Sequence, residues 1–112
     1  MKRDLVFAPF LLLIGVALFL LRFTGMPVHI AISVVGAIVL AVYTVLTRRE
    51  WKIPAFEIIM RACYGIALIS GVVIMNVHGV AVLTLLHRVS AVSFMALIVA
   101  LLSVKAALRK KD

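Results

Sequence analysis

The sequence predicts an all-α integral membrane protein, a bundle of four transmembrane helices forming a single domain over residues 1–112. Three observations support this fold class: 66% of the 112 residues are hydrophobic, only 14% are charged, and the mean hydropathy is +1.28. A soluble domain of this size is about half apolar and about a quarter charged. So few polar side chains would not cover its surface in water. The composition therefore excludes a water-soluble enzyme and a disordered chain.

The first helical hairpin is expected over about residues 5–47. A membrane-spanning helix needs about 20 apolar residues, and the run from Leu5 to Leu21 contains no charge. A basic start before an apolar run is also typical of signal peptides, but the polar turn Arg22–Pro27 follows without a small-x-small cleavage motif, which favours a retained helix. Pro9 is expected in the first turns, where its missing N–H matters least. The second span then covers about Val28 to Thr47.

The second helical hairpin is expected over about residues 54–108, and its sequence allows two registers. In the first register, a helix covers about Pro54 to Met75, Asn76–Gly79 forms the turn, and the last helix starts directly after it. In the second register, a helix covers about Ala62 to Leu86, and residues 52–61 lie along the membrane surface. Both registers contain four spans.

The cost of burying polar groups distinguishes the two registers. The second register places Asn76 and His78 near the middle of the membrane, where polar side chains are costly. The first register leaves Arg88 about two turns inside the boundary, and an arginine near a helix end can extend its guanidinium to the surface. We therefore favour the first register.

Lysine and arginine are distributed unevenly around the four spans, which predicts the orientation. With both termini inside, the inner side holds nine cations: Lys2, Arg3, Arg48, Arg49, Lys52, Lys105, Arg109, Lys110 and Lys111. The outer side holds Arg22 and, in the first register, Arg88. The positive-inside rule thus predicts an N-in and C-in protein of a bacterial-type cytoplasmic membrane. Its expected partners are the lipid bilayer and either a second copy or another membrane subunit. Nucleic acid is not expected, because these cations flank apolar runs.

Few polar side chains are expected within the membrane, and they do not indicate catalysis. Glu57 is the only acidic side chain expected there, and its distance of four residues from Arg61 predicts an ion pair on one helix face. The alternative is a proton or cation site, because an acid within a membrane is a functional candidate. Without another acid in reach, a Ser-His-Asp hydrolase is unsupported. The single Cys63 excludes an internal disulfide. We therefore assign no catalytic residue.

The three histidines form the most informative group. His29 opens the second span, His78 lies in or beside the outer turn, and His87 follows nine residues later. At about 100° per residue, nine residues place His78 and His87 on opposite helix faces. His29 and His87 are the preferred axial pair for a haem iron because both lead apolar helices at comparable depth, and His78 is the substitute. Arg22 and Arg88 are placed to pair with haem propionates. The alternative is interfacial histidines bonded to backbone, water or serine.

With Leu86-His87-Arg88 ahead of one apolar helix and His29 at the head of another, the chain resembles the small four-helix membrane b-type cytochromes. This resemblance implies haem b held between helices by paired histidines and electron exchange with quinones or partner proteins. Two-haem members of such families carry further histidines toward the opposite side, where this chain has Val45 and Val104. The resemblance therefore implies at most one haem.

Three function classes follow from the sequence. The first is a haem-b electron-transfer protein, and the second is a non-catalytic accessory or structural subunit of a membrane complex. The third is a small transporter, since small multidrug transporters resemble this chain in length. Those transporters carry an essential glutamate in their first helix, whereas Leu5 to Leu21 contains no acid. This departure counts against cation export.

Overall fold

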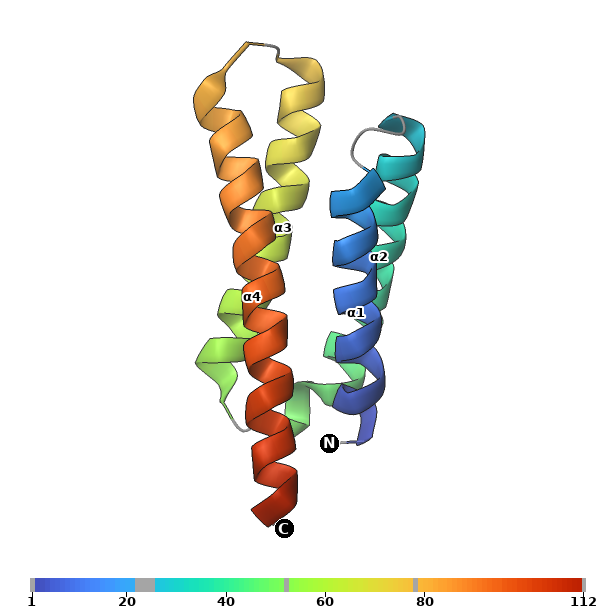
Figure 1. The fold of residues 1–112 in the computed structure, drawn as a ribbon, viewed down its shortest axis with the longest axis vertical. Helices are drawn as coiled ribbons and strands as arrows, with labels where there is room; N and C mark the ends of the chain where they lie inside the picture. Colours follow the sequence, from blue (N-terminus) through green and yellow to red (C-terminus); the bar gives the residue numbers. More distant parts are fainter. Residues whose placement is uncertain (1, 22–25, 52, 78, 112) are drawn as a thin grey trace. The chain divides into compact units, whose positions relative to one another are not determined.

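The computed structural model describes residues 2–21, 26–51, 53–77 and 79–111, and the regular structure of these residues is helical. They form four long helices: α1 (Lys2–Leu20), α2 (Met26–Thr47), α3 (Pro54–Asn76) and α4 (Ala81–Lys111) (Figure 1). A short 3-10 turn, η2 (Arg48–Glu50), follows α2 directly. Each long helix has the length and apolar composition needed to cross a membrane. The all-α class is confirmed for the described residues, and the helices are compatible with a multi-pass integral membrane protein.

The helix boundaries of the second half correspond to the first predicted register. α3 begins at Pro54, where a proline at the first helical position loses no hydrogen bond, and ends at Asn76. The N–H of Val77 donates to the carbonyl of Val73 at 2.8 Å and completes the last turn. Gly79 has φ +82°, a left-handed conformation that glycine adopts without steric cost. The turn therefore falls between Asn76 and Ala81.

The first helix differs from its prediction in one respect. α1 begins at Lys2, three residues before Leu5, so Pro9 is its eighth residue and lies inside the helix. The expectation that Pro9 falls in the first turns was wrong. Without an N–H, Pro9 leaves the carbonyl of Leu5 without its usual helical donor. The extension has a tertiary cause, because Arg3 and Asp4 both contact α2.

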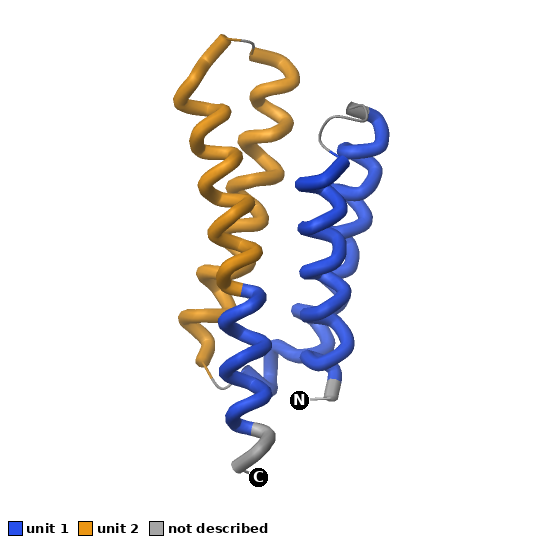
Figure 2. The backbone as a smooth tube through the Cα atoms, in the orientation of Figure 1, with its two compact units in different colours: residues 1–52, 98–112 blue, residues 53–97 orange. Residues whose placement is uncertain are grey.

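The chain divides into two compact units, which are described separately (Figure 2). Unit 1 comprises residues 1–52 and 98–112, and therefore contains α1, α2 and the C-terminal part of α4. Unit 2 comprises residues 53–97, with α3 and the N-terminal part of α4. The prediction of one domain with hairpins over about 5–47 and 54–108 stays a prediction.

Each unit has its own buried side chains. In unit 1, Tyr43 is fully buried and stacks on Phe7 with ring centroids 5.2 Å apart. In unit 2, the buried rings of Tyr64 and Phe94 meet edge to face at 4.9 Å. Large apolar side chains are also exposed along all four helices, among them Leu13, Ile38, Ile69 and Val82. Such a surface suits hydrocarbon far better than water.

Candidate functional site

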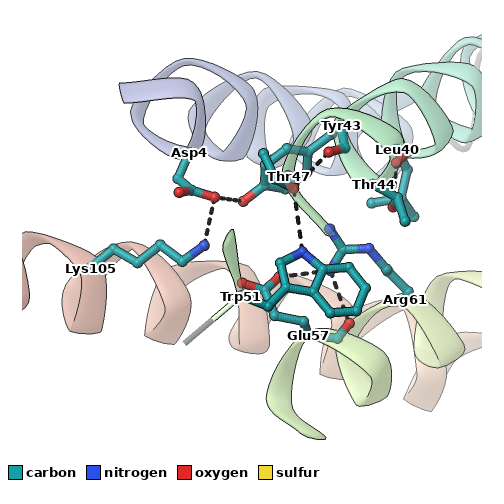
Figure 3. A network of polar contacts seen from close by, with 9 residues as sticks. All are labelled: Asp4, Leu40, Tyr43, Thr44, Thr47, Trp51, Glu57, Arg61 and Lys105. Carbon is teal, nitrogen blue, oxygen red and sulfur yellow. Dashed lines mark hydrogen bonds and ion pairs between the residues drawn. The ribbon is translucent and has the colours of Figure 1, made fainter. Parts of the chain in front are cut away.

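A buried polar cluster lies in unit 1 and brings together α1, α2 and α4. The hydroxyl of Tyr43 donates to Oδ1 of Asp4, and Nζ of Lys105 donates to the same oxygen at 2.5 Å (Figure 3). Asp4 is only 4% exposed, and the side chain of Lys105 is 12% exposed. A carboxylate taken out of water needs a counter-charge and hydrogen-bond donors. Lys105 and Tyr43 supply both.

This cluster corrects one prediction from the sequence. Asp4 lies within the apolar span Arg3–Leu20, so Glu57 is not the only acidic side chain in a candidate span. The uncharged run begins only at Leu5, whereas α1 begins at Lys2 and so includes Asp4. The missed signal is Lys105, a cation that directly follows the uncharged stretch 89–104 of α4, since a cation next to such an apolar stretch favours an acidic partner.

The ion pair predicted for α3 is present in unit 2. Nη1 of Arg61 lies 2.7 Å from Oε2 of Glu57 and also donates to the Glu57 carbonyl at 3.0 Å. The Glu57 side chain is 1% exposed and that of Arg61 13%. The pair is therefore confirmed, and Asp4 and Glu57, the two acids that are buried among the described residues, each have a cationic partner.

His87 is held against α3 by a defined set of small residues. Its Nδ1 lies 2.7 Å from the carbonyl oxygen of Ala67 and 3.4 Å from Oγ of Ser70. The Ser70 hydroxyl donates to the carbonyl of Ile66 at 2.7 Å, so its proton is already used. A Cβ at Gly71 would lie 3.2 Å from Cε1 of the imidazole. The absence of that atom leaves room for the ring on the α3 backbone.

The contact with Ala67 also determines the tautomer of His87. A carbonyl oxygen can only accept, so Nδ1 must carry the proton and donate it to Ala67. In a neutral imidazole the lone pair then lies on Nε2. This is the form in which a histidine binds a metal through Nε2.

The other predicted haem residues are distributed over the two units, and two of them lie outside the described residues. His29 lies in the first turn of α2 in unit 1, half-buried, and its carbonyl accepts from Oγ of Ser33 at 2.8 Å. His87 belongs to unit 2, so the pairing of His29 with His87 stays a prediction. Arg88 is exposed on α4, next to His87. His78 and Arg22 lie outside the described residues.

Among the described residues, no group of three or more His, Cys, Asp or Glu side chains gathers as a metal site. A haem iron takes only two protein ligands, so the predicted histidine pair is a different kind of site. Comparison of the chain with protein-family models, with curated proteins and with solved structures gave no match.

Proposed function

We propose that this chain is a four-span, N-in and C-in protein of a bacterial-type cytoplasmic membrane that binds one haem b through paired histidines and transfers electrons. The observation that supports this function best is the hydrogen bond from Nδ1 of His87 to the Ala67 carbonyl. Histidines that bind metals nearly always donate their other ring N–H to a carbonyl, carboxylate or water. That bond sets the ring orientation and raises the basicity of Nε2.

The remaining residues of the proposed site follow from the sequence. His29, at the head of α2, is the preferred second ligand, and His78 is the substitute. Arg88 is exposed beside His87 and, together with Arg22, would pair with the propionates. When bound, the haem supplies reversible one-electron transfer, while this chain holds it, orients it and excludes water.

The hydrogen bond from His87 to Ala67 also supports a second candidate function, that of a non-catalytic accessory subunit. The bond from His87 to Ala67 links α4 to α3, and Gly71 leaves room for the imidazole ring against α3. A histidine in this position stabilises a membrane protein whether or not it binds iron. Transport is less well supported, because the buried Asp4 and Glu57 are both paired with cations.

Two substitutions of His87 distinguish the haem function from the accessory function. In His87→Asn, the side-chain amide N–H takes the place of Nδ1–H and can still donate to Ala67, but no atom replaces Nε2. His87→Ala removes both. Ser93→Ala, a half-buried serine elsewhere on α4, is the matched control.

The measurement is the visible spectrum and haem content of protein purified after expression with ample haem. We expect a low-spin spectrum for the wild type and for Ser93→Ala, and loss of haem from His29→Ala and from both His87 variants. A colourless wild type would eliminate the haem function and leave the accessory one. A coloured His87→Asn protein would show that the role of His87 is structural and that the iron ligands lie elsewhere.

A further inference from the structure

One end of unit 1, where α1 begins and α2 ends, carries three exposed arginines: Arg3, Arg48 and Arg49. We call this surface the basic face. Nη1 of Arg3 donates to the carbonyl of Leu46 at 2.9 Å and lies 3.9 Å from Oε1 of Glu50. Arg48 and Arg49 stand between those two contact points in η2. The three arginine residues therefore lie at the same end of unit 1.

The charge on the basic face is only partly compensated. Glu50 contacts the basic face, and the three arginines and this glutamate carry a combined formal charge of +2. Lys105 differs, because its charge is taken up by Asp4. The Arg3 side chain is 53% exposed and so remains accessible to a ligand. The basic face therefore has unused capacity for an anion.

A tryptophan adjoins the basic face. Nε1 of Trp51 donates to Oγ1 of Thr47 at 3.3 Å, which holds the half-buried indole beside the end of α2 (Figure 3). Tryptophan is enriched at the level of lipid headgroups. A tryptophan beside the basic face therefore fits a surface at the level of lipid headgroups.

An apolar groove of about 350 Å³ lies along the α1–α2 hairpin, lined by side chains that include Phe10, Ile14, Ala17, Ile32 and Val35. Three of its four α1 residues, Phe10, Ile14 and Ala17, lie within about 40° of Arg3 around the helix axis, and Leu13 lies about 80° away. At a rise of about 1.5 Å per residue, the groove extends from about 10 to about 21 Å beyond Arg3. It therefore lies on the side of α1 that carries Arg3, at the depth of acyl chains.

We propose that unit 1 binds an anionic phospholipid, with its phosphate on the basic face and one acyl chain in the α1–α2 groove. Arginine suits this role because its guanidinium donates paired hydrogen bonds to phosphate oxygens. The net charge of +2 selects an anionic lipid over a zwitterionic one. This inference rests on the membrane insertion in the proposed function and is independent of the haem.

The test compares lipid retention by the purified chain in nanodiscs that contain phosphatidylcholine and phosphatidylglycerol in equal amounts. Native mass spectrometry then reports which lipids stay bound. We expect preferential retention of phosphatidylglycerol by the wild type, weakened about fivefold for each arginine replaced by glutamine. The series runs from the single variant Arg49→Gln to the triple variant Arg3→Gln/Arg48→Gln/Arg49→Gln, which should lose most of the preference. The matched control replaces the same three residues with lysine, which keeps the charge and should keep most of the preference.

Two further experiments test whether the groove binds an acyl chain and whether the bound anion is a lipid phosphate or free phosphate. Ala31→Phe fills the groove at an exposed lining position and should reduce lipid retention without changing the charge. Inorganic phosphate in excess should not displace the lipid. Equal retention of the two lipids, an unchanged preference in the triple glutamine variant, or displacement by phosphate would overturn the proposal. Extraction of the wild type from membranes by alkaline carbonate would instead refute the insertion itself.

Discussion

Asp4→Asn tests whether the buried cluster of unit 1 stabilises the fold. The substitution keeps the size of the side chain but removes the charge that Lys105 contacts at 2.5 Å and that Tyr43 contacts through its hydroxyl. Lys105, whose side chain is 12% exposed, is left with an ammonium group that has lost its counter-charge. The flexible Lys105 side chain can extend its ammonium group toward the surface, which reduces the loss of stability.

The expected loss can be bounded from the burial of the pair. Removing one partner of a buried ion pair costs about 3–5 kcal/mol, and the exposure of Lys105 puts this case near the lower end, at about 3 kcal/mol. Tyr43→Phe removes one hydrogen bond to a charged acceptor and should cost about 1.5 kcal/mol. The double variant Asp4→Asn/Lys105→Met removes both charges. Its loss of stability should therefore be smaller than the sum of the losses in Asp4→Asn alone and Lys105→Met alone.

The assay is reversible unfolding of the detergent-solubilised protein, followed by helical circular dichroism. Glu50→Gln is the matched control, since its exposed contact with Arg3 at 3.9 Å should contribute no more than about 0.5 kcal/mol. An Asp4→Asn variant as stable as Glu50→Gln would refute a stabilising role for the cluster. Additive losses in the double variant would show that Asp4 and Lys105 do not interact.

Three other predictions follow from single contacts. Gly71→Ala places a Cβ 3.2 Å from Cε1 of His87, and displacing the ring should lower the free energy of unfolding by about 1 kcal/mol; an unchanged value would show that the ring yields freely. Gly79→Ala forces alanine to φ +82° and should cost about 1 kcal/mol in the same assay, whereas a neutral effect would mean that the turn relaxes. Reporter fusions after Asp112 and near Gly25 should report a cytoplasmic C-terminus and an external first turn, and an external C-terminus would reverse the orientation.

Local patterns in the sequence determined the helices and the pairing within one helix. Four apolar runs predict four spans because the length of a run and its hydropathy are properties of consecutive residues. Pro54 and Gly79 mark a helix start and a turn through the conformations that each residue favours. The pair Glu57–Arg61 was predictable because a helix places residues four apart on one face.

Contacts between helices were decided only by the tertiary structure. Asp4 meets Tyr43 and Lys105 at separations of 39 and 101 residues, and His87 meets Ala67 at a separation of 20. These contacts depend on which faces of the helices pack together and at which height. A helix that is apolar on every side has no sequence pattern that marks its buried face. The sequence therefore determined where the helices are, while packing decided which polar side chains meet.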